Sequence, residues 1–157
     1  MALRVAEPVE WTIAEGGNGH FYQLVIETEP ISWHQAARAA AGRFHRGRRG
    51  HLVSVTSARE DQFVIDKLLM ETSLRGAWMG MTDSLREANF RWVTGEPFEF
   101  SNWAHSPRKQ PDNYREASWH GGEDYGMYAD YVGDKQWAWN DLSVDSIQEK
   151  VSAYIIE

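Results

Sequence analysis

The first half of the chain begins with an apolar run and continues with apolar positions spaced as on a helix. The run from Phe21 to Ile26 follows the glycine-rich turn 16–19, and this combination predicts a strand. Ser32 is a favourable helix cap, and the residues after it predict a helix that ends at about Gly42. The expected buried face of that helix consists of Trp33, Ala36, Ala37 and Ala40.

A short strand and a second helix are expected next. The apolar run 51–55 predicts the strand. Ser57 and Glu60 have the S-x-x-E spacing of a capping box, which predicts a helix from about Ala58 to Glu71. The expected buried stripe of this helix is Phe63, Val64, Lys67 and Leu68.

Beyond residue 82 the helical period disappears, and the apolar runs are as short as strands. The segment 78–81 is almost wholly apolar, which is typical of a strand in the middle of a core. Further strands are expected at 90–93, 127–132, 136–139 and 151–156. Two early helices followed by mostly strands indicate an α+β domain. The long segment 104–122 is rich in aromatic and polar residues, so we expect a functional loop there.

Between the two helices we expect a basic loop, residues 43–50, with four arginines and no acid. A solvated connection is one interpretation of this segment, and contact with an anionic partner is the other.

A chain of 157 residues fits a single domain, here 1–157 with its core from about residue 20 onward. Eight tryptophans are an unusually large number for this length. Tryptophan buries a large area and also offers a flat apolar face to ligands. We expect five or six of the eight to lie in the core.

The net charge is −7, and the last third of the chain carries the excess of acids. A nucleic-acid-binding protein generally needs a basic face, so no nucleic-acid partner is expected. Focused acidity suggests a cation site, with a solvated acidic surface as the alternative. No apolar stretch is long enough to span a membrane, so membrane insertion is not expected, and the start of the chain lacks the pattern of a signal peptide.

Three short segments in the last third carry oxygen ligands: Gln110-Pro111-Asp112, Glu123-Asp124 and Trp139-Asn140-Asp141. They supply carboxylates and side-chain amides, and the chain has no cysteine that could provide a thiolate. This is the ligand set of a hard cation, calcium before magnesium.

The same segments, in this order, resemble the long-loop region of C-type lectins. Other stretches agree with that family: Gly50-His51-Leu52-Val53-Ser54-Val55, Trp78-Met79-Gly80-Met81 and Phe100-Ser101-Asn102-Trp103. The resemblance covers nearly the whole chain, from about Phe21 to Glu157. It implies a C-type lectin-like fold with two helices, antiparallel sheets and a long calcium-binding loop.

The resemblance also implies the site. The principal calcium ligands would be Gln110, Asp112, Glu123, Asn140 and Asp141, with a cis Gln110–Pro111 bond. Two vicinal sugar hydroxyls would complete the coordination, so that Gln110, Asp112, Glu123 and Asn140 serve the ion and the sugar together. The Gln-Pro-Asp order implies galactose or N-acetylgalactosamine, with Tyr114 or Trp119 against the apolar face of the sugar.

A second calcium position is also implied by the resemblance. Its side-chain ligands would be Asp83, Glu87, Asn113 and Asp124. An ordinary turn acid and a solvent-facing glutamate explain Asp83 and Glu87 as well, so both interpretations remain.

One departure from the family is large. The positions where these domains usually have cysteines correspond here to Ala40, Tyr125, Val144 and Ile156. Core packing would then replace two disulfides, each of which typically contributes about 2–4 kcal/mol. The family suggests a secreted or cell-surface protein, but a chain without cysteine does not require an oxidising compartment.

Catalysis is not expected. Glu123 and Asp124 are adjacent, so on an extended segment they point to opposite faces and cannot flank one glycosidic bond. The six histidines show no metal-ligand spacing, and no G-x-S-x-G elbow occurs. The alternative to a lectin is a module of the same fold that binds a protein, ice or another non-sugar ligand. A single shallow sugar site is expected to be weak, so an oligomer or a multidomain chain would be needed for avidity.

Overall fold

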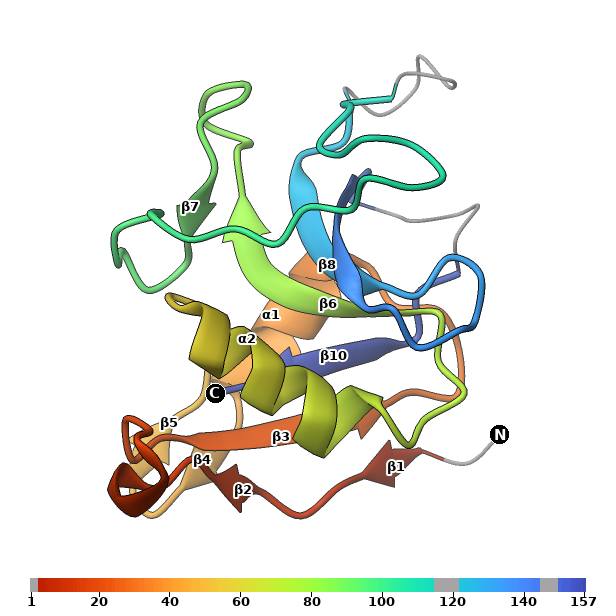
Figure 1. Ribbon diagram of the computed structural model, residues 1–157. Helices are drawn as coiled ribbons and strands as arrows, with labels where there is room; N and C mark the ends of the chain where they lie inside the picture. The colour runs from red at the N-terminus through yellow and green to blue at the C-terminus, as the bar shows by residue number, and fades with distance from the viewer. Residues whose placement is uncertain (1–2, 115–121, 145–149) are drawn as a thin grey trace.

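The computed structural model describes residues 3–114, 122–144 and 150–157. Within these residues, eight strands join one sheet in the order β1-β3-β10-β6-β8-β9, with β2 paired to β3 and β7 paired to β6 (Figure 1). These strands are β1 (Arg4–Val5), β2 (Val9–Glu10), β3 (Phe21–Ile26), β6 (Gly76–Thr82), β7 (Arg91–Trp92), β8 (Tyr125–Ala129), β9 (Ala138–Leu142) and β10 (Ala153–Ile156). The pairing of β10 with β6 is parallel, and the other pairings are antiparallel.

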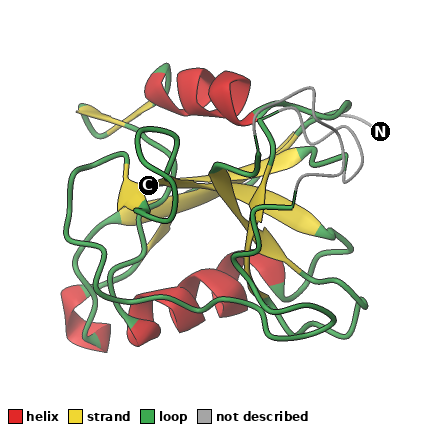
Figure 2. Ribbon diagram, turned by 90° about the horizontal axis from the view of Figure 1, so that it is seen from above, coloured by secondary structure: helices red, strands yellow, loops and turns green. Residues whose placement is uncertain are grey.

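The two helices lie on opposite sides of this sheet (Figure 2). Helix α1 (Trp33–Ala41) packs in one apolar cluster with buried residues of β6, β8 and β10. Helix α2 (Ala58–Val64) continues into a π-helical stretch, η2 (Ile65–Leu69), and packs in a second cluster on the other face. A single-turn helix, η1 (Ile13–Glu15), precedes β3. The α+β fold with two helices is confirmed.

Helix α1 begins and ends as the sequence predicts. The Ser32 hydroxyl accepts the backbone N–H of Gln35, and the Gln35 side chain accepts the backbone N–H of Ser32. Each bond satisfies a donor that the first helical turn leaves without a partner. The apolar face then buries Trp33, Ala36 and Ala40.

Helix α2 differs from its prediction at two residues. Ser57 does cap it, but the buried carboxylate of Glu60 accepts the backbone N–H and the hydroxyl of Thr56 and the hydroxyl of Tyr22. Lys67, expected in the buried stripe, is exposed. The π-helical stretch explains this, because its wider turn shifts the helical period so that Ile65, Leu68 and Leu69 are buried.

Two further predictions of local structure were wrong. The basic segment is a hairpin, β4 (Phe44–His45) paired with β5 (Arg48–Arg49), and not an irregular loop. The segment 51–55 is buried but forms only an isolated bridge between Leu52 and Ile156, so it is not a regular strand. Instead, the Val53 backbone N–H donates to the Ile155 carbonyl, and the Val53 carbonyl accepts the Gly80 N–H.

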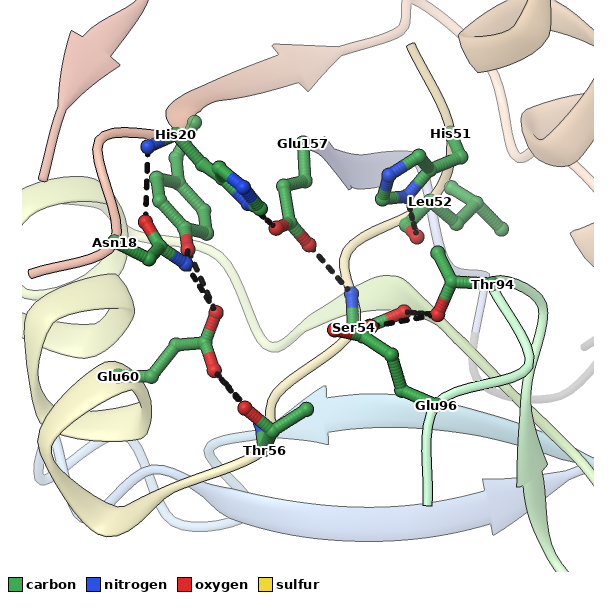
Figure 3. A network of polar contacts seen from close by, with 11 residues as sticks. Asn18, His20, His51, Leu52, Ser54, Thr56, Glu60, Thr94, Glu96 and Glu157 are labelled. Atoms are coloured by element: carbon green, nitrogen blue, oxygen red, sulfur yellow. Dashed lines mark hydrogen bonds and ion pairs between the residues drawn. The ribbon is translucent and has the colours of Figure 1, made fainter. Parts of the chain in front are cut away.

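A polar network links the residues just before β3 to α2 and to the residue after β10 (Figure 3). The Glu157 carboxylate accepts the backbone N–H of Ser54 at 3.1 Å and lies 2.5 Å from Nδ1 of His20. Burial raises the pKa of Glu157, and the neighbouring His20 and His51 oppose that shift. The C-terminal strand is therefore held by side-chain bonds as well as by its ladder.

Six tryptophans are buried, which confirms the expected core: Trp11, Trp33, Trp78, Trp92, Trp137 and Trp139. Trp103 is half-buried, and Trp119 lies outside the described residues. The four residues that the resemblance assigns to the family's cysteine positions lie in or against one apolar cluster: Ala40, Tyr125 and Ile156 are buried, and Val144 packs against them. These four side chains are therefore part of the core packing. No helix in the described part of the chain is both long enough and apolar enough to cross a bilayer.

Asp61 on α2 is a buried acceptor on which three donors converge. Its carboxylate accepts the Tyr128 hydroxyl at 2.7 Å, the Trp139 indole N–H at 2.9 Å and the Asn102 amide at 2.8 Å. Burial raises the pKa of Asp61, and these three donors lower it in part. Asn102 and Trp139 flank the approach to the long loop, so Asp61 links α2 to the strands beneath that loop.

We predict that Asp61→Asn destabilises the domain by about 2–3 kcal/mol, because the new amide points a donor at buried donors. For a domain of this size this corresponds to a melting temperature lower by roughly 5–10 °C. Thermal unfolding measures the effect, with Asp66→Asn on the same helical segment as the control because Asp66 is exposed. Equal melting temperatures for the two variants would contradict the role of Asp61.

Candidate functional site

The candidate site forms where the loop 104–114 meets the end of β8 and the strand β9. Figure 1 shows this region at the opposite end of the molecule from β4 and β5. The Gln110–Pro111 bond is cis, as expected, and the backbone N–H of Gln110 bonds the Ala104 carbonyl at 2.8 Å. The loop thereby turns Gln110 inward, where its side chain is buried.

Asp141 fastens the loop to β9. Its two carboxylate oxygens accept the backbone N–H of Asp112 at 3.2 Å and that of Asn113 at 2.9 Å. Asp141 sits opposite Gly126 in the β8–β9 ladder, so its position is set by the sheet. The strand thus provides a fixed carboxylate, and the loop is arranged around it.

Two hydrogen bonds join the segment at Asn113 and Tyr114 to Glu123. The Glu123 backbone N–H donates to Oδ1 of Asn113 at 2.9 Å, and the Glu123 carboxylate accepts the Tyr114 backbone N–H at 2.7 Å. Asn113 has a φ of 44°, and a side chain on Gly122 (φ 119°) would collide with its Oδ1. Glycine at 122 is therefore needed for the close approach of these two segments.

Three carboxylates converge as a result. Single oxygens of Asp112, Glu123 and Asp141 all lie within 4.8 Å of one another. Their exposure is graded: Asp141 is buried, Glu123 is half-buried and Asp112 is exposed. The cluster therefore has one closed side and one side open to solvent.

Two carboxyl groups of the cluster have raised pKa values. Burial raises the pKa of Glu123 to about 8, with the charges of Asp141 and Asp112 adding to the shift. Burial also raises the pKa of Asp141 to about 6, against two backbone N–H donors and together with the charge of Asp112. Both shifts have the same main cause, which is burial of carboxyl groups, and the charges of neighbouring carboxylates add to it.

Two amide oxygens complete the donor set. Oε1 of Gln110 and Oδ1 of Asn140 are buried and accept no hydrogen bond from the described residues. A buried acceptor without a donor costs free energy unless an ion or water satisfies it. With three carboxylates beside them, these oxygens fit a hard cation with oxygen ligands.

The comparisons with known proteins agree with this geometry. The family model described as the lectin C-type domain matches residues 29–151. This chain belongs to the C-type lectin family. The family, and the relatives and fold neighbours named as lectins, consist of non-enzymatic carbohydrate-binding proteins, so the expectation of no catalysis is confirmed.

Individual relatives are moderately similar. The lectin domain is 33% identical over 133 residues to the mouse C-type lectin domain family 4 member F, covering 82% of this chain and 20% of the relative. It is 35% identical over 97 residues to an α-N-acetylgalactosamine-specific lectin of Patiria pectinifera, covering 60% of this chain and 51% of the relative. The chain spans about half the length of these relatives or less.

Among solved structures, the C-type lectin CEL-I from Cucumaria echinata has a TM-score of 0.65 at 27% identity and covers 86% of this chain and 88% of its own. A calcium-independent type II antifreeze protein has a TM-score of 0.62 at 19% identity, covering 98% of this chain and 95% of its own. The second likeness shows the fold alone.

The remaining predicted residues have different surroundings. Asp83 is buried, and its Oδ2 accepts the Ala88 backbone N–H at 2.8 Å. Burial raises the pKa of Asp83, and the charges of Glu87 and Asp124 add to this. Oδ1 of Asp83 accepts no bond from the described residues. The Asn113 side chain is engaged by Glu123.

Arg108 is a residue at the site that the sequence did not predict. Its guanidinium lies over the Tyr114 ring, 4.7 Å from the centroid, and Tyr114 remains 40% exposed. An arginine six positions before an aromatic residue in a loop carries no local signal of such a contact. Trp119, the other predicted aromatic sugar contact, lies outside the described residues.

Proposed function

We propose that this lectin domain binds galactose-type sugars through a calcium ion. The ligands would be Gln110, Asp112, Glu123, Asn140 and Asp141. The observation that carries the proposal is the convergence of three carboxylates within 4.8 Å, beside two buried amide oxygens that lack donors. Five oxygen donors from the long loop, the residue pair before β8 and the strand β9 suit calcium, which accepts irregular geometry, better than magnesium.

Calcium would neutralise the repulsion within the cluster and leave coordination positions on the exposed side, at Asp112. Two vicinal sugar hydroxyls can occupy those positions. Each hydroxyl donates its proton to a carboxylate and accepts one from an amide N–H of Gln110 or Asn140. The same side chains of Gln110, Asp112, Glu123 and Asn140 would thus bind ion and sugar.

The choice of galactose rests on three supports. The Gln-Pro-Asp order resembles that of galactose-binding members of the family. The relative from Patiria pectinifera is named as specific for α-N-acetylgalactosamine. Tyr114 offers an exposed ring at the edge of the site, with Arg108 against one ring face. The apolar face of galactose would lie on the exposed part of that ring.

A second calcium ion at Asp83, Glu87, Asn113 and Asp124 is a separate proposal. The buried Oδ1 of Asp83 without a donor supports it. However, in the described part of the chain, the group of three acids whose ligand atoms lie within 4.8 Å of one another belongs to the principal site and not to this second one. Calcium stoichiometry from calorimetry tests this: two equivalents, reduced to one in Asp83→Asn, would support the second ion, and a single equivalent would reject it.

The principal proposal is tested by calorimetry with galactose and with mannose, once in millimolar calcium and once with chelator. We expect galactose to bind only in the presence of calcium, and more tightly than mannose. Calcium binding without either sugar would point to the alternative, a module of this family that recognises a protein or another non-sugar ligand. No calcium binding would reject the mechanism. Weak monovalent binding would also require several copies of the domain for avidity, in an oligomer or a longer chain.

A further inference from the structure

The β4–β5 hairpin is a compact cationic surface on an acidic protein. Residues 43–49 contain four of the sixteen lysines and arginines and no acid, whereas the whole chain has a net charge of −7. Residues 44–49 are all exposed. None of the four arginines forms an ion pair with a carboxylate in the described part of the chain. Their charge is therefore available to an external anion.

The turn of the hairpin holds an arginine at a position that disfavours it. Arg46 and Gly47 both have positive φ, 50° and 79°, as in a two-residue type I′ turn. Glycine, asparagine or aspartate is usual at the first position, and other residues are disfavoured there by about 1–2 kcal/mol. The local backbone therefore does not explain the presence of arginine at this position.

Aromatic rings accompany these charges. The Arg46 guanidinium lies over the Phe21 ring, 4.6 Å from its centroid, and the His45 ring lies 4.5 Å from the same ring. Phe44 is 67% exposed. The hairpin thus presents cations next to apolar ring faces.

A groove of about 690 Å³ runs along this surface, between the hairpin, the start of β3 and the end of β10. Its lining includes Phe21, Phe44, Arg46, Arg48, His20 and Glu157. Glu157 is the acid in that lining, and its side chain is 5% exposed and engaged by His20 and Ser54. The acid of the groove is therefore largely shielded from solvent, whereas Arg46, Arg48 and Arg49 are exposed.

We propose that this groove is a second binding site, for anionic saccharides that bear sulfate or carboxylate groups. Guanidinium groups bind both anions with paired donors, and exposed rings pack against the C–H faces of sugar rings. A nucleic acid is disfavoured by the net negative charge of the rest of the protein. The site lies at the opposite end of the molecule from the calcium cluster and shares no residue with it (Figure 1). Its binding is independent of calcium.

The test is binding of a size-defined heparin oligosaccharide and of oligogalacturonate, in chelator, by calorimetry at two salt concentrations. We expect both to bind, and more weakly at the higher salt. Arg46→Gln with Arg48→Gln is expected to weaken heparin binding by about tenfold or more. The matched control is Arg4→Gln with Lys67→Gln, which removes the same charge from exposed positions elsewhere and is expected to change binding less than about twofold.

Phe44→Ala separates saccharide recognition from simple charge attraction. It is expected to weaken the oligosaccharides several-fold and to leave any binding of inorganic tripolyphosphate, which has no apolar face, unchanged. Binding of the oligosaccharides by the hairpin double variant as tightly as by its control would overturn the site. Tighter binding of oligothymidylate or of phosphatidylserine vesicles than of either saccharide would overturn the saccharide assignment. Melting temperatures within a few degrees of the unmodified protein show that each variant is folded. Because all arms are run in chelator, the result does not depend on the calcium-dependent site.

Discussion

Asp141→Asn is expected to abolish calcium-dependent galactose binding and to lower calcium affinity by at least about a hundredfold. Asp141 contributes the most buried carboxylate of the cluster and also accepts the backbone N–H groups of Asp112 and Asn113. Asparagine keeps the shape and one acceptor oxygen, so the loop contact is retained in part while the charge is lost. Calorimetric titration with calcium, and with galactose at saturating calcium, measures both effects.

A stability measurement distinguishes loss of the ligand from misfolding. In the calcium-free domain, the charge of Asp141 contributes to the raised pKa of Glu123. Removal of that charge relieves repulsion, whereas the new amide points a donor at one of the two backbone N–H groups that Asp141 accepts. These two effects oppose each other, so calcium-free Asp141→Asn is expected to melt within a few degrees of the calcium-free unmodified domain. Addition of calcium should raise the melting temperature of the unmodified domain and not that of Asp141→Asn. Asp66→Asn, an exposed change of the same kind, should behave as the unmodified domain does. Galactose binding retained by Asp141→Asn would refute the site.

The second large expected effect is the dependence of calcium affinity on pH. Without calcium, the pKa of Glu123 is raised to about 8 and that of Asp141 to about 6, chiefly by burial. Calcium binds the ionised carboxylates, so binding below these pKa values releases protons. Each proton released costs about tenfold in affinity per pH unit. We therefore expect affinity to be nearly constant above pH 8 and to fall roughly a hundredfold between pH 8 and pH 6.

The change of folding stability with rising pH has opposite signs with and without calcium. Both carboxyls have folded-state pKa values above their ordinary values, so the calcium-free fold binds more protons than the unfolded chain between about pH 4 and pH 8. Through these two groups, the calcium-free domain loses stability as pH rises across that window. The stabilisation by calcium instead grows with pH. Melting curves from pH 5.5 to 8.5, with calcium and with chelator, measure the difference between the two. A calcium-induced shift that stays constant across this range would contradict the assignment of Glu123 and Asp141.

Local features of the fold could be read from the sequence because they depend on residues close together in the chain. The cap at Ser32, the buried face of α1 and the apolar strand β6 follow from spacing and capping alone. The π-helical stretch after Val64 could not be read this way. Nor could the second role of Glu60, whose carboxylate bonds Tyr22, 38 positions away. Those features depend on which elements pack together.

The candidate site shows the same division. The order of the Gln-Pro-Asp, Glu-Asp and Asn-Asp segments, together with family resemblance, predicted the proposed ligands by residue number. The tertiary structure decided their convergence, because Asp112 and Asp141 meet across 29 positions through the register of β9 against β8. It also decided that Gln110 and Asn140 have buried oxygens without donors, and that Arg108 lies on Tyr114.

The sequence by itself determined the family and the two helices and predicted an oxygen-ligand site, because residue type and spacing carry that information directly. The tertiary structure decided the electrostatics of the carboxylates and the shape of the basic hairpin. The raised pKa values of Glu123 and Asp141 require burial and neighbouring charge, which arise only when the loop closes on the sheet. In the same way, the arginines line a groove only because the hairpin packs on Phe21 and beside the end of β10.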